Sequence, residues 1–402
     1  MLSVADASRA IADSMPNFGE ISLPLEDAAG RVLRQTVKAE RDQPPFDRVT
    51  MDGIAIRFDA YASGVRRFAV EGTQHAGDIV SAISADDGCI EIMTGGVLPT
   101  GGDCIIPVER ISVQDGVATL EDDYVPERHQ FVHPQGSDFR KGHQALSPGA
   151  VISPLDIAVI ASCGLASVIV NQQPSVHVIS TGNELVPAGQ PIQDHQVRMS
   201  NGPALVSMLV EHGFTNTGHE HLIDEPSILE ARLSRLLKKN SVLILSGGVS
   251  MGKADYVPAV LEKLGVQVVF HKISQRPGKP MWFGIGPENQ AVFALPGNPV
   301  STLVCCRHYV LPALLRACGR KACSAGSVRL AEAISFKPAL TCFMPVRLEA
   351  DDDGLEVASP VATNTSGDFA ALSGTDGYVE LERDVTEFDA GLVVPLHRWN
   401  AP

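Results

Sequence analysis

Four glycine-bearing turns hold most of the residues in this chain that could do chemistry. They lie at the ends of apolar runs in the segments 176–185, 243–256, 273–280 and 292–302. Backbone N–H groups at such turns bind phosphates at the carboxyl ends of the strands of an α/β sheet. The same turns also carry acids and cations, among them Glu184, Asp255, Arg276 and Lys279. The pattern predicts an anion-binding site along one edge of a sheet.

Three acids in or beside these turns could bind Mg²⁺ through their carboxylate oxygens. They are Glu184, Asp224 and Asp255. Each has an ordinary alternative role, because Asp255 precedes an expected helix and could cap it, and Asp224 lies in a turn before Pro226. Three acids that follow strands at one sheet edge can nevertheless meet on a single ion. The combination favours a metal site.

The cations are equally concentrated. Lys272, Arg276 and Lys279 lie within eight residues of a chain whose formal net charge is −15. A solvated turn is the simplest explanation. However, Pro277 and Gly278 should make this turn rigid, and cations held in place bind an anion better than mobile ones. The turn is therefore a candidate clamp for an oxyanion.

The segment 247–254, GGVSMGKA, nearly matches a nucleotide-binding P-loop. Gly247, Gly252 and Lys253 have the required spacing, but Ala254 stands where a Ser or Thr must bind magnesium. The sequence therefore does not predict a P-loop ATPase. Two alternatives stay open: a plain turn, or a loop whose glycine N–H groups face a phosphate without P-loop chemistry.

The composition limits the classes of protein to which the chain can belong. Its 402 residues are enough for two to four domains. The net charge of −15 argues against a general nucleic-acid surface, so an anionic substrate would need local cations or a metal. The eight cysteines include no CxxC pair, and the N-terminus resembles neither a signal peptide nor a membrane span. We expect a cytoplasmic protein without a membrane segment.

The order of the expected elements indicates how the turns are positioned. Helices are expected at 203–212, 226–238, 256–264 and 299–317, and strands at 176–180, 241–246, 266–272, 280–285 and 291–295. Such alternation predicts right-handed βαβ units and a mostly parallel sheet that is covered on both faces. We assign this central α/β domain to residues 171–322.

The remaining regions have other patterns. Residues 46–140 contain short alternating runs broken by Gly and Pro, which predicts a small inserted β domain. The insertion interrupts a helical and extended domain made of 1–45 and 141–170, in which 153–156 reads as a capped helix start. Residues 323–402 return to β patterning, typical of a small barrel or sandwich. The expected fold class is multidomain α/β plus β.

The motifs together resemble one family. PPFDRVTMDG, IMTGG, PTGGDCIIPVE, STGNEL, SGGVSMGKADY, RPGKP and LPGNPVS occur in the order and spacing of MoeA-type molybdopterin molybdenumtransferases, and the gephyrin C-terminal domain is similar. The resemblance covers residues 4–396. It implies Mg²⁺-dependent insertion of molybdate into adenylylated molybdopterin, with release of AMP. It also implies an elongated homodimer whose cleft is shared by the α/β domain and the partner's MDG segment (51–53), with a molybdopterin adenylyltransferase and apo-molybdoenzymes as further partners.

The resemblance also implies roles for individual residues. The residues implied in catalysis are Asp52, Glu184, Asp224, Asp255, Lys272, Arg276 and Lys279, and three of these acids, Glu184, Asp224 and Asp255, are the implied metal ligands. Taken with the glycine turns, it implies that molybdopterin or its nucleotide contacts Thr94, Asp138, Thr181, Gly182, Ser246, Gly247, Gly248, Ser250, Gly252, Pro296, Gly297, Asn298, Pro299, Arg347 and Ser373.

The chain departs from the family pattern in three places. Arg48–Val49–Thr50 replaces a usual Asn-Ser-Ala, Asn183 replaces an Asp, and Pro345 replaces the first Arg of a tail motif that keeps Arg347. Residues two apart in a strand share a face. We therefore expect Arg347 to supply part of the anion binding that is lost at Pro345, with a higher requirement for molybdate. The alternative is a catalytically weakened pterin-binding or scaffolding paralogue.

Overall fold

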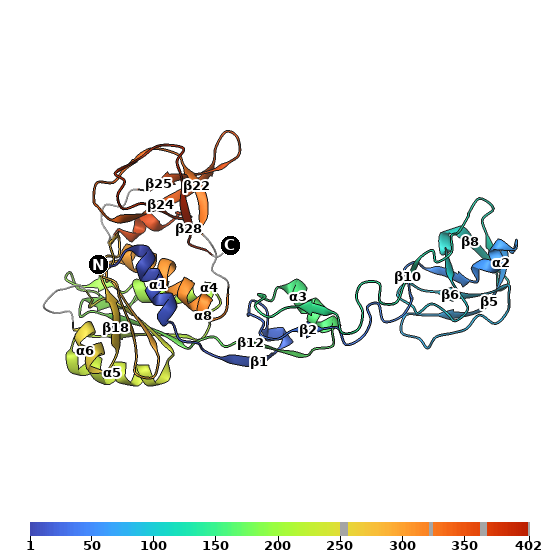
Figure 1. Cartoon of the computed structure of the whole chain (residues 1–402), viewed down its shortest axis with the longest axis horizontal. Helices are drawn as coiled ribbons and strands as arrows, with labels where there is room; N and C mark the ends of the chain where they lie inside the picture. Colours follow the sequence, from blue (N-terminus) through green and yellow to red (C-terminus); the bar gives the residue numbers. More distant parts are fainter. Residues whose placement is uncertain (250–255, 321–324, 362–367, 401–402) are drawn as a thin grey trace. The chain divides into compact units, whose positions relative to one another are not determined.

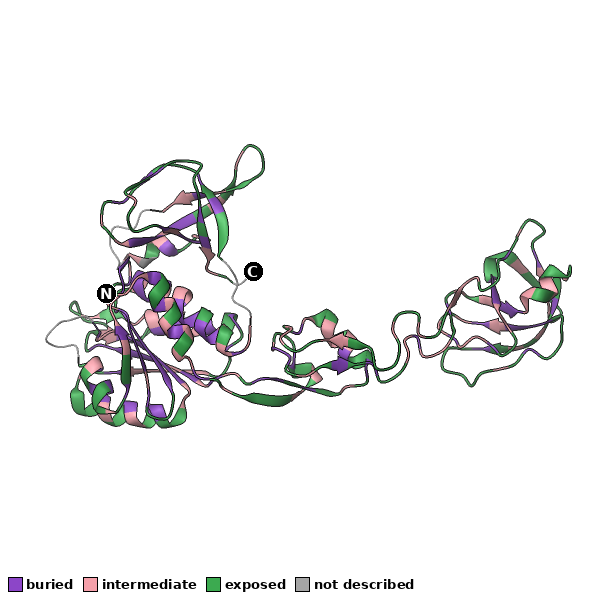
Figure 2. Ribbon diagram, in the orientation of Figure 1, coloured by how far each residue is buried: buried purple, intermediate pink, exposed green. Residues whose placement is uncertain are grey.

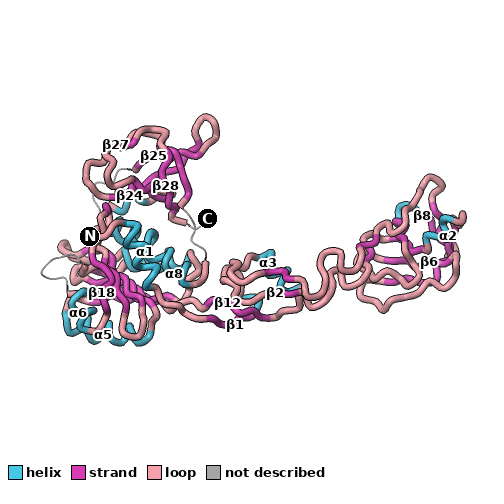
Figure 3. The backbone as a smooth tube through the Cα atoms, in the orientation of Figure 1, coloured by secondary structure: helices cyan, strands magenta, loops and turns pink. Residues whose placement is uncertain are grey.

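The computed structural model describes residues 1–249, 256–320, 325–361 and 368–400. The chain forms two compact units. The first contains Met1–Ser22, Gly30–Val32 and Ile169–Pro402, and the second contains Leu23–Ala29 and Leu33–Val168. Figure 1 gives the order of the elements along the chain, and Figure 3 separates helices, strands and loops. None of the helices in the described residues has the length and apolar character needed to cross a membrane.

The α/β domain of the first unit is built on a covered sheet. Six described strands run in the order β16 (Thr217–Leu222), β13 (Val176–Thr181), β17 (Val242–Ser246), β21 (Ala291–Leu295), β20 (Trp282–Ile285) and β18 (Gln267–His271). The pairs among β16, β13, β17 and β21 are parallel, and β20 is antiparallel to both of its neighbours. The helices around it are α1 (Val4–Ser14), α4 (Asn201–Glu211), α5 (Pro226–Lys239), α6 (Val257–Lys263), α7 (Pro299–Cys305) and α8 (Leu311–Ala317). The mostly parallel sheet that the sequence predicts is confirmed.

The strands of this sheet are buried on both faces, because alternate side chains enter two different hydrophobic clusters. Val178 and Ile244 belong to one cluster, and their neighbours Ile179 and Leu245 belong to the other. Figure 2 shows the buried strands between more exposed helices. Burial of each such side chain contributes about 1.5–3 kcal/mol. This core holds the strand ends, and the turns that follow them, in fixed positions.

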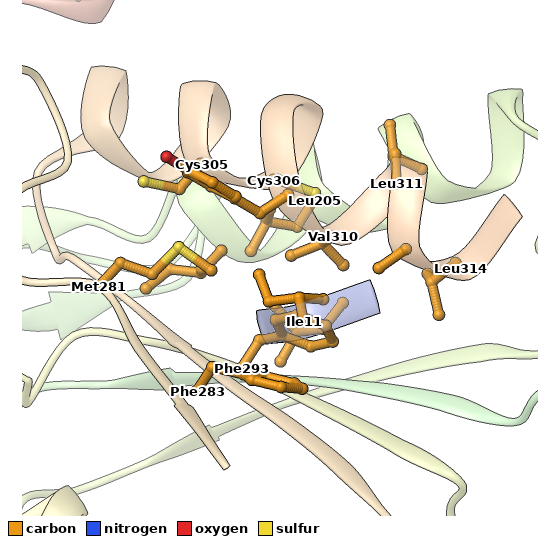
Figure 4. Close-up of a cluster of buried hydrophobic side chains, with 14 of the residues drawn as sticks. Ile11, Leu205, Met281, Phe283, Phe293, Cys305, Cys306, Val310, Leu311 and Leu314 are labelled. Carbon is orange, nitrogen blue, oxygen red and sulfur yellow. The ribbon is translucent and has the colours of Figure 1, made fainter. Parts of the chain in front are cut away.

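Figure 4 shows the cluster on the α1 and α8 side of the sheet. Phe283 and Phe293 are cross-strand neighbours whose ring centroids lie 4.7 Å apart. Ile11 of α1 packs into the same cluster, as does Leu205 of α4. The sequence predicts one domain from residues 1–45 and 141–170, whereas in the structure helix α1 is part of the α/β core.

Two elements of this domain differ from expectation. The helix expected at 299–317 consists of α7, a π-helical turn η3 (Cys306–Val310) and α8. Pro312 explains why the helix is interrupted. It has no N–H to donate to the carbonyl four residues earlier, and its ring would clash with that carbonyl in a regular α-helix. Strand β16 is absent from the expected strands. Its sequence TGHEHL lacks an apolar run because it is an edge strand whose residues are only partly buried.

The C-terminal residues of the first unit form a barrel. The strands described here are β22 (Gly326–Leu330), β23 (Ile334–Ser335), β24 (Thr341–Ala350), β25 (Glu356–Pro360), β26 (Gly377–Leu381), β27 (Glu387–Phe388) and β28 (Val393–Arg398). The order β24-β25-β22-β28-β26 closes because β26 also pairs with β24. The barrel-like domain expected at 323–402 is therefore confirmed, including the turn at Asp351–Gly354 between β24 and β25.

The second unit is dominated by short strands. Its larger sheet has the order β7 (Cys104–Pro107), β4 (Gly53–Ile56), β6 (Gly88–Ile92), β5 (Arg67–Gln74), β9 (Val117–Leu120) and β8 (Ile111–Gln114). Two small ladders pair β3 (Arg48–Val49) with β10 (Val132–His133), and β2 (Val37–Lys38) with β11 (Gln144–Leu146). The described α-helices are α2 (Phe58–Ala62) and α3 (Pro154–Ser162), and two short 3-10 helices are η1 (Leu25–Asp27) and η2 (Val108–Arg110). The ladders place the two ends of segment 46–140 side by side, as an insertion requires.

Helix α3 begins as the sequence predicts. Ser153 accepts a hydrogen bond from the Asp156 backbone N–H, and the Asp156 carboxylate accepts one from the Ser153 backbone N–H. Pro154 occupies the first turn, where its missing N–H has no cost. Gly164 follows the helix with a φ of +86°, a conformation that favours glycine. A two-stranded ribbon of β1 (Glu20–Pro24) and β12 (Ser167–Asn171) precedes the α/β domain. Within that domain β14 (Leu185–Val186) pairs with β15 (Val197–Arg198), and β19 (Gln275–Arg276) pairs with β24 of the barrel.

Candidate active site

The carboxyl ends of the α/β strands form one continuous edge. β13, β17 and β21 end there because they are parallel. β18 also ends there, because it and β21 are both antiparallel to β20. Four strand-to-strand intervals separate β13 from β18, which is about 19 Å at the usual spacing. The predicted acids follow strands at one end of this edge, the cations follow β18 at the other end, and the glycine turns lie between them.

The acids Glu184 and Asp224 are neighbours at the end of parallel strands β13 and β16. Thr181 is in register with Leu222, so the following residues leave the sheet side by side. The Asp224 N–H donates to the Asn183 side-chain oxygen over 3.0 Å. A Cβ atom at Gly182 would lie 2.7 Å from a Glu184 carboxylate oxygen, so the carboxylate lies directly over this glycine. The structure therefore places two of the three predicted metal ligands in adjacent turns after paired parallel strands.

The glycine turns after β17 and β21 lie against each other in the middle of the edge. A Cβ atom at Gly297 would lie 3.5 Å from the Gly247 Cα, and the Gly247 N–H donates to the Leu295 carbonyl over 3.2 Å. Thr181 lies on the other side of Gly247, where a Cβ atom would be 2.8 Å from the Thr181 hydroxyl. That hydroxyl is buried without a hydrogen-bond partner among the described groups. It is a polar atom beside the glycine turn, without a partner in the described part of the chain.

Asn201 at the start of α4 cross-links these turns, and the sequence analysis missed it. Its side-chain amide donates to Ser246 Oγ over 2.9 Å, to the Gly297 carbonyl over 2.8 Å and to Thr302 Oγ1 over 3.2 Å. Thr302 is fully buried, and its hydroxyl lies against the carbonyls of Pro296 and Asn298. The only hint of its role in the sequence is its place as a polar residue directly before an apolar helix. No local pattern identifies the three groups that accept its hydrogen bonds.

Replacing Asn201 with Leu should loosen both glycine turns. The buried hydroxyls and the Gly297 carbonyl would lose a donor, at a cost of about 1–3 kcal/mol in the free energy of unfolding. Urea unfolding measures that loss, and substrate titration should show a raised KM because the turns lose their fixed position. Asn240→Leu is a matched control, since Asn240 donates to a single carbonyl at the end of α5. Equal effects of the two substitutions would exclude a special role for Asn201.

The three predicted cations belong to the turn between β18 and β20. Lys272 has a φ of +75°, and its backbone N–H donates to the Met281 carbonyl over 2.9 Å, which closes the turn. Arg276 and Lys279 are exposed. Gly278 is held so close to buried Cys305 that a Cβ atom there would lie 2.4 Å from the sulfur. The turn is fixed to the core at its glycine, while its two exposed cations are accessible to an anion.

The barrel residues Arg347 and Ser373 also lie close together. The Arg347 guanidinium would be 3.9 Å from a Cβ atom at Gly374, the residue after Ser373, and both Arg347 and Ser373 are exposed. The short helix before Ser373, η4 (Phe369–Leu372), contacts α7. Pro345 and Arg347 share a face of β24, as the sequence predicts. Pro345 itself is buried, opposite Tyr378 of β26, so an arginine at position 345 would have to bury its charge.

In the second unit, Asp52 and Thr94 form a pair. The Thr94 hydroxyl and backbone N–H both donate to one Asp52 carboxylate oxygen, over 2.5 and 2.6 Å. Both hydrogen bonds stabilise the ionised carboxylate and so lower the pKa of Asp52 below its usual value. The hydroxyl makes the larger contribution and the N–H the smaller one. The structure thus brings two predicted residues together and keeps the carboxylate negative to lower pH.

Thr94→Val should raise the pKa of Asp52 towards its usual value, since it removes the hydroxyl donor and leaves only the N–H. A carboxylate with a lowered pKa in the folded state stabilises the fold above its unfolded pKa, and this contribution is lost as the pH falls through the folded pKa. In the variant, this contribution should be smaller, and its loss should be complete at a higher pH, because the folded pKa is higher. NMR titration of the Asp52 carboxyl carbon measures the shift. Thr73→Val is the control, because Thr73 donates to Glu91 in the same sheet and should leave Asp52 unchanged.

Asp138 has different neighbours from those of Asp52. A carboxylate oxygen of Asp138 lies 2.9 Å from His133 Nε2, and the other ring nitrogen of His133 lies 3.1 Å from the Arg48 guanidinium. β3, which carries Arg48, pairs with both β10 and the segment after Thr94. Arg48, one of the departures from the family pattern, therefore contacts His133 directly, and His133 in turn contacts the predicted site acid Asp138.

The structure groups the predicted residues into two sets, one in each unit. The first unit holds Glu184, Asp224, the glycine turns, the cation turn, Arg347 and Ser373, and Asn298 and Pro299 at the start of α7. The second unit holds Asp52, Thr94 and Asp138. Three predicted residues, Ser250, Gly252 and Asp255, lie outside the described residues.

Comparisons with known proteins cover the whole length of the chain. Residues 2–164 match the MoeA N-terminal region (domain I and II), 177–316 a probable molybdopterin binding domain, and 327–399 the MoeA C-terminal region (domain IV). A molybdopterin molybdenumtransferase from Synechocystis sp. is 38% identical over 400 residues, which is 99% of this chain and 100% of the relative. One from Haemophilus influenzae is 35% identical over 301 residues, 74% of this chain and 73% of the relative.

A solved structure agrees with these matches. The crystal structure of a molybdopterin biosynthesis MoeA protein from Pyrococcus horikoshii superposes with a TM-score of 0.83, at 29% identity, and covers 100% of both chains. The fold, the order of the turns and the full-length sequence similarity agree with one another. The chain belongs to the MoeA family of molybdopterin molybdenumtransferases, which act in molybdenum cofactor biosynthesis.

Proposed function

We propose that the α/β edge binds adenylylated molybdopterin and molybdate, inserts the metal into the pterin and releases AMP. The observation that carries this proposal is the order of groups along the edge: acids after β13 and β16, glycine turns after β17 and β21, and cations after β18. A substrate with phosphates in its middle and an oxyanion at one end would match that order of charges. The names of the relatives support the choice of substrate.

The glycine turns are suited to the phosphates of the substrate. Gly247, Gly248 and Gly297 have no side chains to cover their backbone, so a phosphate can approach closely. The unpartnered hydroxyl of Thr181 lies at the same place and would donate to a phosphate oxygen. Asn201 holds the two turns together and so keeps their N–H groups in one arrangement.

The acids fit a hard divalent cation. Glu184 offers an exposed carboxylate, and Asp224 is held beside it through Asn183, so the donor set consists of oxygens, as Mg²⁺ prefers. Glu184 and Asp224 would hold the ion, with Asp255 added by family resemblance. A bound Mg²⁺ would supply positive charge that offsets the charge of the pyrophosphate group. The glycine turns and cations would then keep the substrate in position.

The cation turn would attract molybdate. Arg276 and Lys279 are exposed on a turn that Gly278 anchors to the core. Strand β19, which contains Arg276, pairs with β24, the strand of Arg347. This pairing ties the barrel to the cation turn, so Arg347 and Ser373 belong to the same part of the molecule as the turn.

Arg347→Ala should raise the molybdate concentration that gives half-maximal rate. An exposed charge contributes about 0.2–1 kcal/mol, which is up to about fivefold in that concentration. Steady-state AMP release at several molybdate concentrations measures it. Arg329→Ala is the control, since Arg329 is an exposed arginine elsewhere on the barrel. An unchanged half-saturating concentration would mean that the tail does not contribute to oxyanion binding.

We further propose that the protein works as a homodimer in the cytoplasm, with Asp52, Thr94 and Asp138 of one copy completing the site of the other. The segregation of the predicted residues into two units motivates this proposal. A molybdopterin adenylyltransferase as the source of substrate and apo-molybdoenzymes as acceptors of the product are the proposed further partners.

The direct test of the function is AMP release by the purified protein. Adenylylated molybdopterin, molybdate and Mg²⁺ should give AMP and a cofactor that activates an apo-molybdoenzyme. Omission of molybdate or addition of EDTA should slow AMP release. Tight pterin binding without AMP release in a single-turnover experiment would instead identify a pterin-binding or scaffolding paralogue. An AMP release rate that is the same in EDTA would contradict the magnesium requirement.

A further inference from the structure

A group of two histidines and a glutamate lies where the α/β domain meets the barrel. His308 is in the π-helical turn η3, Glu380 is in β26, and His397 is in β28, which Figure 1 labels. One potential ligand atom from each residue lies within 4.8 Å of the other two. The three residues come from segments far apart in the sequence, and the proposed reaction uses none of them.

The distances are close to those of a coordinated zinc ion. A tetrahedral Zn²⁺ site with metal–ligand distances of ~2.0–2.2 Å requires its ligand atoms to lie about 3.4 Å apart. His397 Nε2 and a Glu380 carboxylate oxygen already lie 3.2 Å apart. The remaining separations are at most 4.8 Å, so a small side-chain rotation brings the third ligand in. Two imidazoles and one carboxylate are a ligand set that zinc accepts, with the fourth position left for water.

The neighbouring side chains orient one of the histidines. The Tyr378 hydroxyl lies 3.1 Å from His308 Nδ1, which leaves the other ring nitrogen for a metal. A hydrogen bond at the second nitrogen is the usual way in which proteins fix a metal-binding histidine. The His397 ring stacks on Tyr378 at a centroid distance of 5.0 Å, and the His308 ring lies 4.5 Å from Phe343. Packing therefore restricts both imidazole rings to small rotations.

The site is accessible, and its charge is suitable. The side chains of Glu380 and His397 keep 28% and 18% of their exposure, so an ion can reach them from solvent. Arg307 adjoins His308 in sequence, and its guanidinium donates to the Arg398 carbonyl over 2.6 Å. This nearby positive charge would repel a bound cation if all of its ligands were neutral. The carboxylate of Glu380 supplies the negative charge that offsets it.

We propose that His308, Glu380 and His397 form a Zn²⁺ site that ties η3 of the α/β domain to strands β26 and β28 of the barrel. The same barrel carries Arg347 on β24 and Ser373 directly after η4. The ion would therefore stabilise the position of these two residues relative to the α/β domain. The site shares no residue with the acids Glu184 and Asp224. The imidazole ligands of the proposed site suit a transition-series ion such as Zn²⁺, whereas the carboxylate oxygens at the edge of the α/β sheet suit Mg²⁺.

The test is metal binding by the full-length protein after removal of metal with a chelator. Calorimetric titration with ZnCl₂ and metal analysis after dialysis should give one Zn²⁺ per chain at this site, unaffected by excess Mg²⁺. His308→Gln and His397→Gln should each abolish this binding. Tyr378→Phe, which keeps the ring and removes the hydroxyl, should weaken it by about 10–100-fold. When Co²⁺ is bound in place of Zn²⁺, its visible absorption spectrum should be that of a tetrahedral site and should lack a thiolate-to-cobalt charge-transfer band.

Two variants guard against a loss of binding through misfolding or through surface sites. Glu380→Gln keeps the size and a hydrogen bond to His397 but removes the charge, and it should weaken binding while its far-UV circular dichroism stays that of the wild type. His195→Ala removes an exposed histidine elsewhere and should bind Zn²⁺ as the wild type does. Zinc should raise the thermal transition of the wild type but not that of His308→Gln. Equal zinc stoichiometry and affinity in the wild type and in a folded double variant, His308→Gln/His397→Gln, would overturn the proposal, as would absence of saturable binding to the wild type.

Discussion

Glu184→Gln is expected to slow AMP release by about 10²–10³-fold in single turnover, the usual cost of removing one preorganised electrostatic group from an active site. The carboxylate lies over Gly182 at the end of β13, next to Asp224 at the end of β16. The substitution keeps the side chain's size and removes the charge that would hold Mg²⁺. Quenched-flow measurement of AMP from adenylylated molybdopterin, at saturating molybdate and Mg²⁺, determines the rate.

Glu211→Gln is the matched control for this prediction. Glu211 is an exposed acid at the end of α4 in the same domain, so the same change of charge is made away from the strand ends. Its rate should equal that of the wild type. If added Mg²⁺ at high concentration restores part of the rate of Glu184→Gln, the residue acts through the ion. A fully active Glu184→Gln would remove this residue from the proposed site.

Mixing two inactive variants is expected to restore activity. Asp52→Ala damages the set of residues in the second unit, and Glu184→Ala damages the set in the first. In a homodimer with shared sites, each heterodimer has one intact site and one with both defects. Random exchange of subunits makes half of the dimers heterodimers, so the mixture should recover roughly a quarter of the wild-type rate. Each variant alone should stay near background.

The mixing experiment has a built-in control. Combining Glu184→Ala with Asp224→Ala should restore nothing, because both residues belong to the same unit and neither heterodimer site is intact. Subunit exchange is verified by native mass spectrometry with one isotopically labelled partner. If exchange is complete and the Asp52→Ala and Glu184→Ala mixture stays inactive, then each site is built within a single chain.

The local sequence was sufficient wherever a short-range pattern corresponds to one conformation. The capping box at Ser153 and Asp156 begins α3 because both hydrogen bonds are made within four residues. The apolar runs before the glycine turns form buried parallel strands because a sheet covered on both faces needs apolar residues at every position. The same reasoning failed for β16, an edge strand with polar residues, and for helix 299–317, where Pro312 imposes a π-helical turn.

Parallel topology also explains how far the candidate site was predictable. If strands are parallel, their carboxyl ends share an edge, so the sequence could place Glu184 and the glycine turns together, whereas Asp224 follows β16, a strand that the sequence did not predict. That the cation turn lies at the same edge depends on two successive antiparallel pairings, β21 with β20 and β20 with β18. No local pattern in the sequence specifies that pairing.

The sequence by itself determined the family, the fold class and the types of residue present in the glycine-bearing turns, because these depend on motifs and periodicities within short segments. Only the tertiary structure decided which groups meet. It brought Asn201 to Ser246 and Gly297, Thr94 to Asp52, Pro345 into a buried position, and His308 to Glu380 and His397. Such contacts join residues tens of positions apart or more. They follow from how whole elements pack, and no segment of the chain encodes them alone.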